Sequence, residues 1–227
     1  MEQTVEIKSK ININPSRVGK KYYVKTFGCQ MNVHDSEKIA GMFELDGMIK
    51  ANSEENADVL FINTCTIREN ADDKLYGTLG QLKQWKSKQT DRKLLVGGCA
   101  AQKDKTLVRD RAPWVDVVLG THNLTNIINL LNQSEDWGPL TEVVDKIEQM
   151  PTDAPSIRES ESSAWLTIQI GCNNSCTFCI VPSVRGPEIS RRPGDIINEA
   201  KLLVDTGVKE ITLLGQNVNS YGRDLKI

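Results

Sequence analysis

Three cysteines lie close together in residues 171–179, with the spacing C-x3-C-x2-C. They are Cys172, Cys176 and Cys179, and Asn, Ser and Thr fill most of the positions between them. Thiolate sulfur is a soft ligand that suits iron–sulfur clusters. Neither cysteine nor histidine follows in the sequence up to Ile227, so three thiolates would leave one iron of a 4Fe–4S cluster without a protein ligand. An open coordination position is typical of a reactive metal site.

Two other interpretations compete with the cluster. A structural zinc site usually has four ligands in two pairs, and the sequence offers no second pair near this one. Three cysteines without a metal would have to pack in an apolar core, which a loop of polar residues does not favour. We therefore favour a cluster bound by Cys172, Cys176 and Cys179.

A second set of cysteines is dispersed along the chain. Cys29, Cys65 and Cys99 each follow a segment predicted to be a buried strand, because it is rich in apolar and β-branched residues. These strands are 22–27, 59–63 and 93–97. If they are parallel neighbours, their carboxyl ends meet at one edge of the sheet, where ligands bind. Three independent buried cysteines would look the same in the sequence, so the spacing leaves both interpretations open.

The first 132 residues alternate predicted strands with helical patterns. A fourth strand and four helices complete the alternation, at 115–119 and at 35–43, 68–88, 102–111 and 122–131. Asp35 is placed to cap the first of these helices. Such alternation predicts an α/β fold, with an open, mostly parallel sheet and helices on both of its faces.

Residues 133–163 interrupt this pattern with prolines, serines and eight acidic residues, and they contain one possible short strand at 140–144. A second alternation follows, with a strand at 165–170, a helix at 193–206 and a strand at 210–214. One strand–helix–strand unit cannot cover both faces of its own sheet, so we expect a C-terminally truncated second domain. The assigned segments are an N-terminal tail (1–20), a first domain (21–132), an acidic linker (133–163) and an incomplete second domain (164–227).

The composition is that of an ordinary globular protein, with 39% hydrophobic and 26% charged residues among 227. No segment approaches the ~20 apolar residues of a membrane helix, and the polar N-terminus lacks the apolar core of a signal peptide. The net charge of −2 gives no general attraction to nucleic acid. We expect an intracellular protein, in which reduced cysteines bind metals more often than they form disulfides.

The tight cysteine set carries a family resemblance. Its C-x3-C-x2-C spacing, with Phe178 before the last cysteine and a predicted strand directly before the loop, resembles the signature of radical S-adenosylmethionine enzymes. The resemblance implies a full or partial (βα) barrel, with the site at the carboxyl ends of its strands. It also implies that the open iron binds S-adenosylmethionine, whose one-electron reduction yields a 5′-deoxyadenosyl radical. Phe178 and Gln216 are then expected to contact S-adenosylmethionine.

The dispersed set extends the resemblance. The motifs TFGCQMN (26–32), NTCTIR (63–68) and GGCA (97–100) are similar to the N-terminal domain of the methylthiotransferases. The motifs RGPEISR (185–191) and LLGQNVNSYG (213–222) resemble the radical domain of the same family. Their order along residues 21–226 makes the resemblance specific. It implies that Cys29, Cys65 and Cys99 hold a second, auxiliary 4Fe–4S cluster, which provides or carries the inserted sulfur.

The first and last motifs are most similar to the branch of the family that methylthiolates carbon 2 of N6-(dimethylallyl)adenosine in tRNA, at position 37 beside the anticodon. The implied cofactors are two 4Fe–4S clusters and S-adenosylmethionine. The implied partners are this tRNA and a low-potential electron donor such as flavodoxin or ferredoxin, and we expect a cytoplasmic monomer without a membrane partner. The alternatives are a methylthiotransferase acting on threonylcarbamoyladenosine tRNA or on a ribosomal protein, and a non-catalytic, truncated metal-binding module.

The remaining candidate residues have ordinary explanations. His34 and His122 fit surface or capping positions better than catalysis. Arg185, Arg191 and Arg192 flank the cysteine loop and are able to bind a carboxylate or phosphate, although a solvated loop explains them almost as well.

Overall fold

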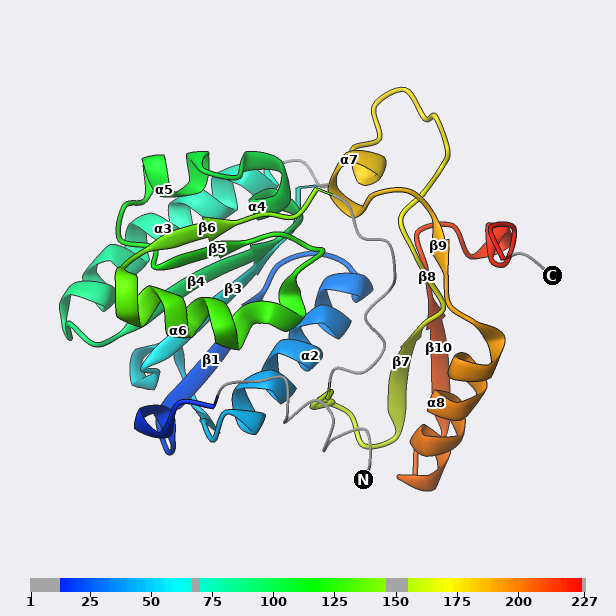
Figure 1. The fold of residues 1–227 in the computed structure, drawn as a ribbon, viewed down its shortest axis with the longest axis horizontal. Helices are drawn as coiled ribbons and strands as arrows, with labels where there is room; N and C mark the ends of the chain where they lie inside the picture. The colour runs from blue at the N-terminus through cyan, green and yellow to red at the C-terminus, as the bar shows by residue number, and fades with distance from the viewer. Residues whose placement is uncertain (1–12, 67–69, 146–154, 226–227) are drawn as a thin grey trace.

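The computed structural model describes residues 13–66, 70–145 and 155–225. Its largest element is a six-stranded sheet in the order β2-β1-β3-β4-β5-β6, in which all neighbouring strands run parallel (Figure 1). The strands are β1 (Lys21–Thr26), β2 (Ile49–Lys50), β3 (Val59–Thr64), β4 (Lys93–Gly98), β5 (Val117–Leu119) and β6 (Leu140–Glu142). Helices cover both faces of this sheet, so the predicted α/β fold is confirmed.

Each face of the sheet has its own apolar core. The helices are α2 (Gln30–Leu45) and α6 (Ile127–Trp137) on one face, and α3 (Ala71–Ser87), α4 (Cys99–Asp104) and α5 (Leu107–Arg111) on the other (Figure 1). Successive residues of β3 alternate between the cores: Phe61 packs in the first core, and Leu60 and Ile62 pack in the second. Because both faces are covered, every residue of β3 is buried.

The second half of the chain forms a smaller αβ unit beside this sheet (Figure 1). Its elements are β7 (Ser163–Thr167), β8 (Gln169–Ile170), α7 (Val181–Arg185), β9 (Ile189–Ser190), α8 (Pro193–Asp205) and β10 (Glu210–Leu214). β7 and β10 pair in parallel, and β8 pairs antiparallel with β9. The predicted strand–helix–strand unit is therefore confirmed. α7 packs against α4 and β7 against α2, so the two halves of the chain are in contact.

Four short 3-10 turns complete the described elements: η1 (Pro15–Arg17), η2 (Glu54–Asn56), η3 (Leu124–Asn126) and η4 (Val218–Ser220). Across the described ranges, no helix combines the length and apolar character needed to cross a membrane.

Several predicted boundaries differ from the structure. α2 begins at Gln30 and Cys29 is its N-cap, so the prediction that Asp35 caps this helix is wrong. Asp35 lies within the helix, where it is buried and pairs with Arg185. The helix predicted at 102–111 is divided into α4 and α5 because Lys105 has a φ of 51°, which a right-handed helix cannot contain. The strand predicted at 165–170 is interrupted at Ile168 and forms β7 and β8.

The segment expected to be an acidic linker contributes to the first sheet. α6 continues to Trp137, and β6 pairs with β5 where the short strand was expected. Further along, the Ile157 backbone N–H donates to the Glu37 carbonyl on α2 at 2.9 Å. The backbone at Pro155 can approach α2 this closely because the helix carries Gly41 at that point. A Cβ added to Gly41 would lie 2.3 Å from the Pro155 carbonyl oxygen. The domain limits themselves stay a prediction.

A buried charge cluster fixes the N-terminal turn against the first domain. The Arg17 guanidinium lies 2.6 Å from the Asp46 carboxylate and 2.6 Å from the Glu135 carboxylate, and it donates to the Asn132 side chain at 2.6 Å. The side chains of Arg17 and Asp46 have no exposed surface. Arg17, expected in an N-terminal tail, therefore belongs to the packed domain, while residues 1–12 lie outside the described residues.

Candidate functional site

The dispersed cysteines lie at one edge of the six-stranded sheet. β1, β3 and β4 are adjacent parallel strands, and their register pairs Thr26 with Asn63 and Thr64 with Gly98. Cys29, Cys65 and Cys99 follow these strand ends within three residues, so all three lie at the carboxyl edge, as the strand predictions indicated. Their role as metal ligands stays a prediction.

The turn that carries Cys29 is closely packed against the turn that carries Cys65. Gly28 has a φ of +139°, and a Cβ added there would lie 2.5 Å from the Asn32 side-chain oxygen and 3.1 Å from the Cys65 Cβ. Only glycine fits this position. Cys29 then adopts the extended backbone of an N-cap, and its thiol donates to Asn32 Oδ1 at 3.4 Å.

Two buried asparagines hold the first two cysteine turns together, and no sequence pattern indicates this role. Asn32 Nδ2 donates to the Thr64 carbonyl at 3.0 Å and to Asn63 Oδ1 at 3.1 Å. Asn63 Nδ2 donates in return to the Asn32 carbonyl at 2.8 Å. Both side chains are fully buried, so each bond replaces one that water would make in the unfolded chain. A buried, reciprocally bonded pair of this kind fixes backbone positions that an apolar contact would leave free to slide.

Cys99 begins α4 directly after Gly98, whose φ is +93°. A Cβ on Gly98 would lie 2.5 Å from the Thr64 carbonyl oxygen, so this glycine allows the turns after β3 and β4 to meet. Cys99 is buried, and burial raises the pKa of its thiol. The positive charge of the nearby Arg185 guanidinium opposes that rise in pKa.

A cavity of about 180 Å³ lies beside these cysteines. Its walls come from both halves of the chain: Cys29, Gln30, Met31 and Cys99 from the first, and Arg185, Leu214, Gly215 and Gln216 from the second. Gln216, expected to contact S-adenosylmethionine, thus lies beside the sheet-edge cysteines. The site at this edge is complete only when both halves of the chain are in contact.

The donor set at the sheet edge fits an iron–sulfur cluster better than a single metal ion. Among the described residues, no group of three or more His, Cys, Asp or Glu side chains is placed to hold one ion. A 4Fe–4S cluster is larger than one ion and each thiolate binds a different iron, so its ligands surround a cube instead of a single point. Three thiols on three adjacent turns, with a cavity beside two of them, provide soft ligands and space together.

The tight set of cysteines lies in the loop between β8 and α7, which projects beyond the sheets in Figure 1. Cys172 is buried at the base of the loop, and Cys176 and Cys179 are exposed. The base is held by two bonds: the Cys172 N–H donates to the Gly186 carbonyl at 3.2 Å, and the Glu188 N–H donates to Asn173 Oδ1 at 3.0 Å. The loop thus presents two free thiols on a fixed base.

Phe178 lies in the same loop, and its side chain is 95% exposed. A large apolar side chain that is almost completely in water has no role in packing, which is consistent with a ligand-contacting position.

The histidines and two of the arginines are buried, against expectation. His34 and His122 are 3% and 8% exposed, and burial lowers the pKa of both imidazoles. Arg191 donates to the Thr167 carbonyl and pairs with Glu199, so it stabilises the second half of the chain. The surface interpretation of His34 and His122 is wrong, because contacts between distant segments bury them. For Arg185 and Arg191 the solvated-loop alternative is wrong, and each pairs with a carboxylate, as the other interpretation had it.

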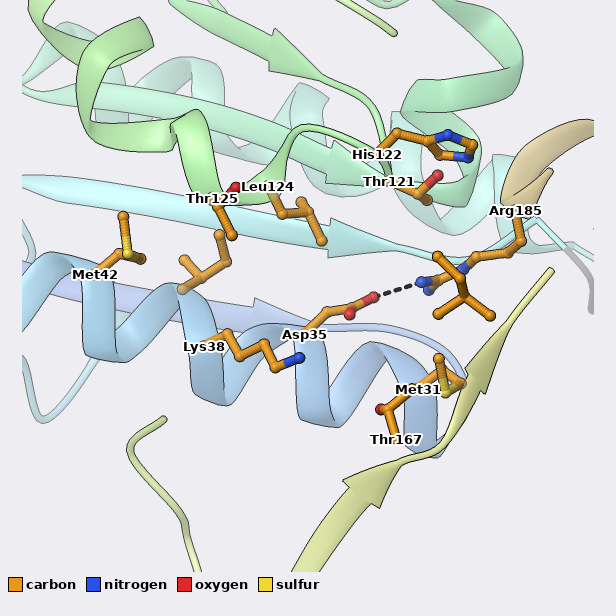
Figure 2. A pocket seen from close by; sticks show the side chains of 12 residues that line it. Met31, Asp35, Lys38, Met42, Thr121, His122, Leu124, Thr125, Thr167 and Arg185 are labelled. Atoms are coloured by element: carbon orange, nitrogen blue, oxygen red, sulfur yellow. Dashed lines mark ion pairs between the residues drawn. The ribbon is translucent and has the colours of Figure 1, made fainter. Parts of the chain in front are cut away.

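A second, smaller pocket lies between α2 and the second half of the chain, as Figure 2 shows. Its polar side chains include Asp35 and Lys38 of α2, His122, and Arg185 of α7. The dashed line in Figure 2 marks the ion pair between Arg185 Nη1 and Asp35 Oδ2, at 2.8 Å. Arg185 therefore lines both this pocket and the cysteine cavity.

Gly171→Ala is expected to lower the free energy of unfolding more than Gly222→Ala. Both glycines have positive φ, 73° and 84°, so each alanine has a similar backbone cost of about 1 kcal/mol. At Gly171 the new methyl group would also lie 2.0 Å from the Pro187 carbonyl oxygen, whereas nothing lies within 4 Å at Gly222. Urea unfolding measures the difference, and equal losses would contradict the close packing at the base of the cysteine loop.

The sequence matches two protein families. Residues 21–120 match "Uncharacterized protein family UPF0004", and residues 166–227 match the "Radical SAM superfamily". These ranges contain the dispersed and the tight cysteine sets, respectively.

Curated relatives match nearly the whole chain. A tRNA-2-methylthio-N(6)-dimethylallyladenosine synthase of Corynebacterium jeikeium is 52% identical over 98% of this chain and 43% of the relative. The protein of the same name from Corynebacterium diphtheriae is 54% identical over 90% of this chain and 40% of the relative. The chain thus spans less than half the length of these relatives.

Solved structures share the fold. The radical S-adenosylmethionine methyltransferase TsrM from Kitasatospora setae, with tryptophan and a SAM analogue bound, matches 88% of this chain and 48% of its own, with a TM-score of 0.55 and 10% identity. The same enzyme with cobalamin and a [4Fe-4S] cluster gives a TM-score of 0.53 at 10% identity, over 89% of this chain and 50% of its own. The likeness at this identity concerns the fold alone. By its two family matches and its relatives, the chain belongs to the methylthiotransferase family of radical S-adenosylmethionine enzymes.

Proposed function

We propose that the chain is part of an enzyme that methylthiolates carbon 2 of N6-(dimethylallyl)adenosine in tRNA, beside the anticodon, using two 4Fe–4S clusters and S-adenosylmethionine. The observation that carries the proposal is the division of the six cysteines into two sets of three. One set lies at the carboxyl edge of the first sheet, and the other lies in the C-x3-C-x2-C loop. Relatives named for this reaction, at 52–54% identity, support the choice of substrate.

In this proposal the loop thiols of Cys172, Cys176 and Cys179 hold the radical cluster. A cluster bound there supplies the electron that cleaves S-adenosylmethionine. The protein supplies a fixed loop base, two exposed thiols and the exposed ring of Phe178, which offers a flat apolar surface to a bound nucleoside. An aromatic C–H bond has neither an acidic proton nor a leaving group, so the remaining chemistry depends on the cofactors, and the protein orients them and excludes water.

The sheet-edge thiols of Cys29, Cys65 and Cys99 hold the auxiliary cluster. Asn32 and Asn63 fix the turns of the first two cysteines, and Gly98 permits the third turn to approach them. Gln216 would contact S-adenosylmethionine, and it lines the same cavity as Cys29 and Cys99. The buried surroundings of Cys65 and Cys99 keep solvent from the sulfur atoms.

The proposed partners follow from this reaction. The tRNA carries the modified adenosine, and a low-potential protein such as flavodoxin or ferredoxin supplies the electrons. We further propose a cytoplasmic location, where tRNA is available, and a monomeric state.

The test is the content of iron, sulfide and zinc per chain after anaerobic reconstitution. Two clusters of this type predict about eight irons per chain. The variant with Cys172→Ala, Cys176→Ala and Cys179→Ala is expected to bind about four, and the matched variant with Cys29→Ala, Cys65→Ala and Cys99→Ala is also expected to bind about four. Stoichiometric zinc without stable iron would contradict the proposal and would favour a non-catalytic metal-binding module.

A further inference from the structure

Arg185 is a buried cation that the second half of the chain places beside the cysteines of the first half. It is the last residue of α7, and its side chain is only 6% exposed. Its guanidinium pairs with Asp35 of α2 at 2.8 Å, and the residue lines the same cavity as Cys99. With Met31, it forms part of the wall of both the cysteine cavity and the pocket of Figure 2. Arg185 therefore borders both cavities.

The backbone around Arg185 is held by the first half of the chain. The Thr121 hydroxyl donates to the Val184 carbonyl at 2.6 Å, directly before Arg185. Directly after it, Gly186 has a φ of +77°, and an added Cβ would lie 3.0 Å from the His122 ring. α7 also packs against α4, the helix that Cys99 begins. Contacts at the residues directly before and after Arg185 thus hold its backbone in place relative to Cys99.

The charges facing Arg185 come from several elements. Asp35 is the carboxylate that pairs with it, and Lys38, one turn further along α2, adds a second positive charge to the pocket. An arginine guanidinium is effectively always protonated, so Arg185 carries its positive charge into this buried position. A buried cation is stabilised only by compensating charge and hydrogen bonds. The Asp35 carboxylate provides the compensating charge here, and the cavity wall that Arg185 shares with Cys99 places the same cation beside a proposed cluster ligand.

We propose that Arg185 is a positioning residue of the sheet-edge cysteine site, which seats Cys99 and places a fixed positive charge against the sulfur ligands of the auxiliary cluster. The inference rests on the proposed function, because it takes Cys99 as a cluster ligand. The reduction potential of an iron–sulfur cluster depends on nearby charge and on hydrogen bonds to its sulfurs. A neighbouring cation stabilises the more negative, reduced state, so Arg185 raises the reduction potential of this cluster.

The experiment measures the midpoint potential of the auxiliary cluster by EPR-monitored redox titration. The parent protein carries Cys172→Ala, Cys176→Ala and Cys179→Ala, so that the signal comes from the sheet-edge site alone. Arg185→Gln, which keeps a hydrogen-bonding amide without the charge, is expected to shift the midpoint to more negative values. Arg185→Lys restores a positive charge and is expected to return the midpoint toward that of the parent. Asp35→Asn removes a negative charge and is expected to shift it in the opposite direction.

The matched control is Arg191→Gln. Arg191 is another buried arginine of the second half, but it binds the Thr167 carbonyl and Glu199 and does not line the cysteine cavity. The auxiliary cluster of the Arg191→Gln variant is expected to have the same midpoint potential as that of the parent. If the Arg185→Gln variant has the same midpoint as this control, the inference is overturned. If the Arg185→Gln variant binds no iron, the Asp35→Asn variant provides the deciding measurement. A midpoint potential in that variant equal to that of the parent overturns the inference. A parent without iron contradicts the proposed function, and the inference falls with it.

Discussion

Combined substitution of Cys172→Ala, Cys176→Ala and Cys179→Ala is expected to abolish formation of 5′-deoxyadenosine from S-adenosylmethionine, while the chain stays folded. Cys176 and Cys179 are exposed and Cys172 lies at the loop base, so little packing is lost with the thiols. The proposed function assigns the electron for S-adenosylmethionine cleavage to a cluster on these three residues. Without them the anaerobic protein, supplied with a chemical reductant, is expected to yield only the background of the iron-free chain. Chromatography of the nucleoside products measures this directly.

The matched control replaces the other cysteine set. Cys29→Ala, Cys65→Ala and Cys99→Ala together remove an equal number of thiols from the sheet edge and are expected to leave S-adenosylmethionine cleavage in place. Far-UV circular dichroism confirms the fold of both variants. Undiminished 5′-deoxyadenosine from the loop variant, or loss of cleavage only in the sheet-edge variant, would contradict the assignment of the two sets.

Arg17→Met is expected to reduce the free energy of unfolding by about 3–5 kcal/mol, the range for removing one partner of a buried ion pair. The substitution keeps most of the side-chain volume but leaves the Asp46 carboxylate, which has no exposed surface, without its cation. It also removes the cation that pairs with Glu135 of α6. Asp46 caps the end of α2 and Glu135 lies near the end of α6. We therefore expect the substitution to destabilise both helices that pack on this face of the sheet. Urea unfolding followed by circular dichroism gives the value.

The control for this variant is Lys88→Met, which removes an exposed ion pair with Glu55 at 3.1 Å. Exposed pairs contribute about 0–1 kcal/mol, because water already solvates both charges. Similar losses in the two variants would show that the Arg17 cluster has no special contribution to stability.

The sequence predicted the elements whose pattern is local. Apolar runs marked β1, β3 and β4, and a cysteine after each run was sufficient to place Cys29, Cys65 and Cys99 at one edge once the strands were taken as parallel. The helix α8 was predicted from a proline at its start, a glycine beyond its end and an amphipathic pattern between them. These signals lie within a few residues of one another, so no knowledge of distant contacts was needed.

The features that were missed depend on contacts between distant segments. Asn32 and Asn63 look like ordinary polar loop residues until their turns are brought side by side. Arg185 could equally have been a solvated loop residue, and it is buried only because α7 packs on α4. β6 has three residues and gains its stability from pairing with β5, so its place in the first sheet could not be read from its own composition.

The shared walls of the cysteine cavity have a consequence for biosynthesis. Chains emerge from the ribosome N-terminus first, and domains fold as they emerge. The sheet edge with Cys29, Cys65 and Cys99 is therefore made before Arg185 and residues 214–216, which later form the opposite wall of the cavity. Under the proposed function, iron and sulfide can therefore reach the sheet-edge thiols before the second half of the chain closes the cavity.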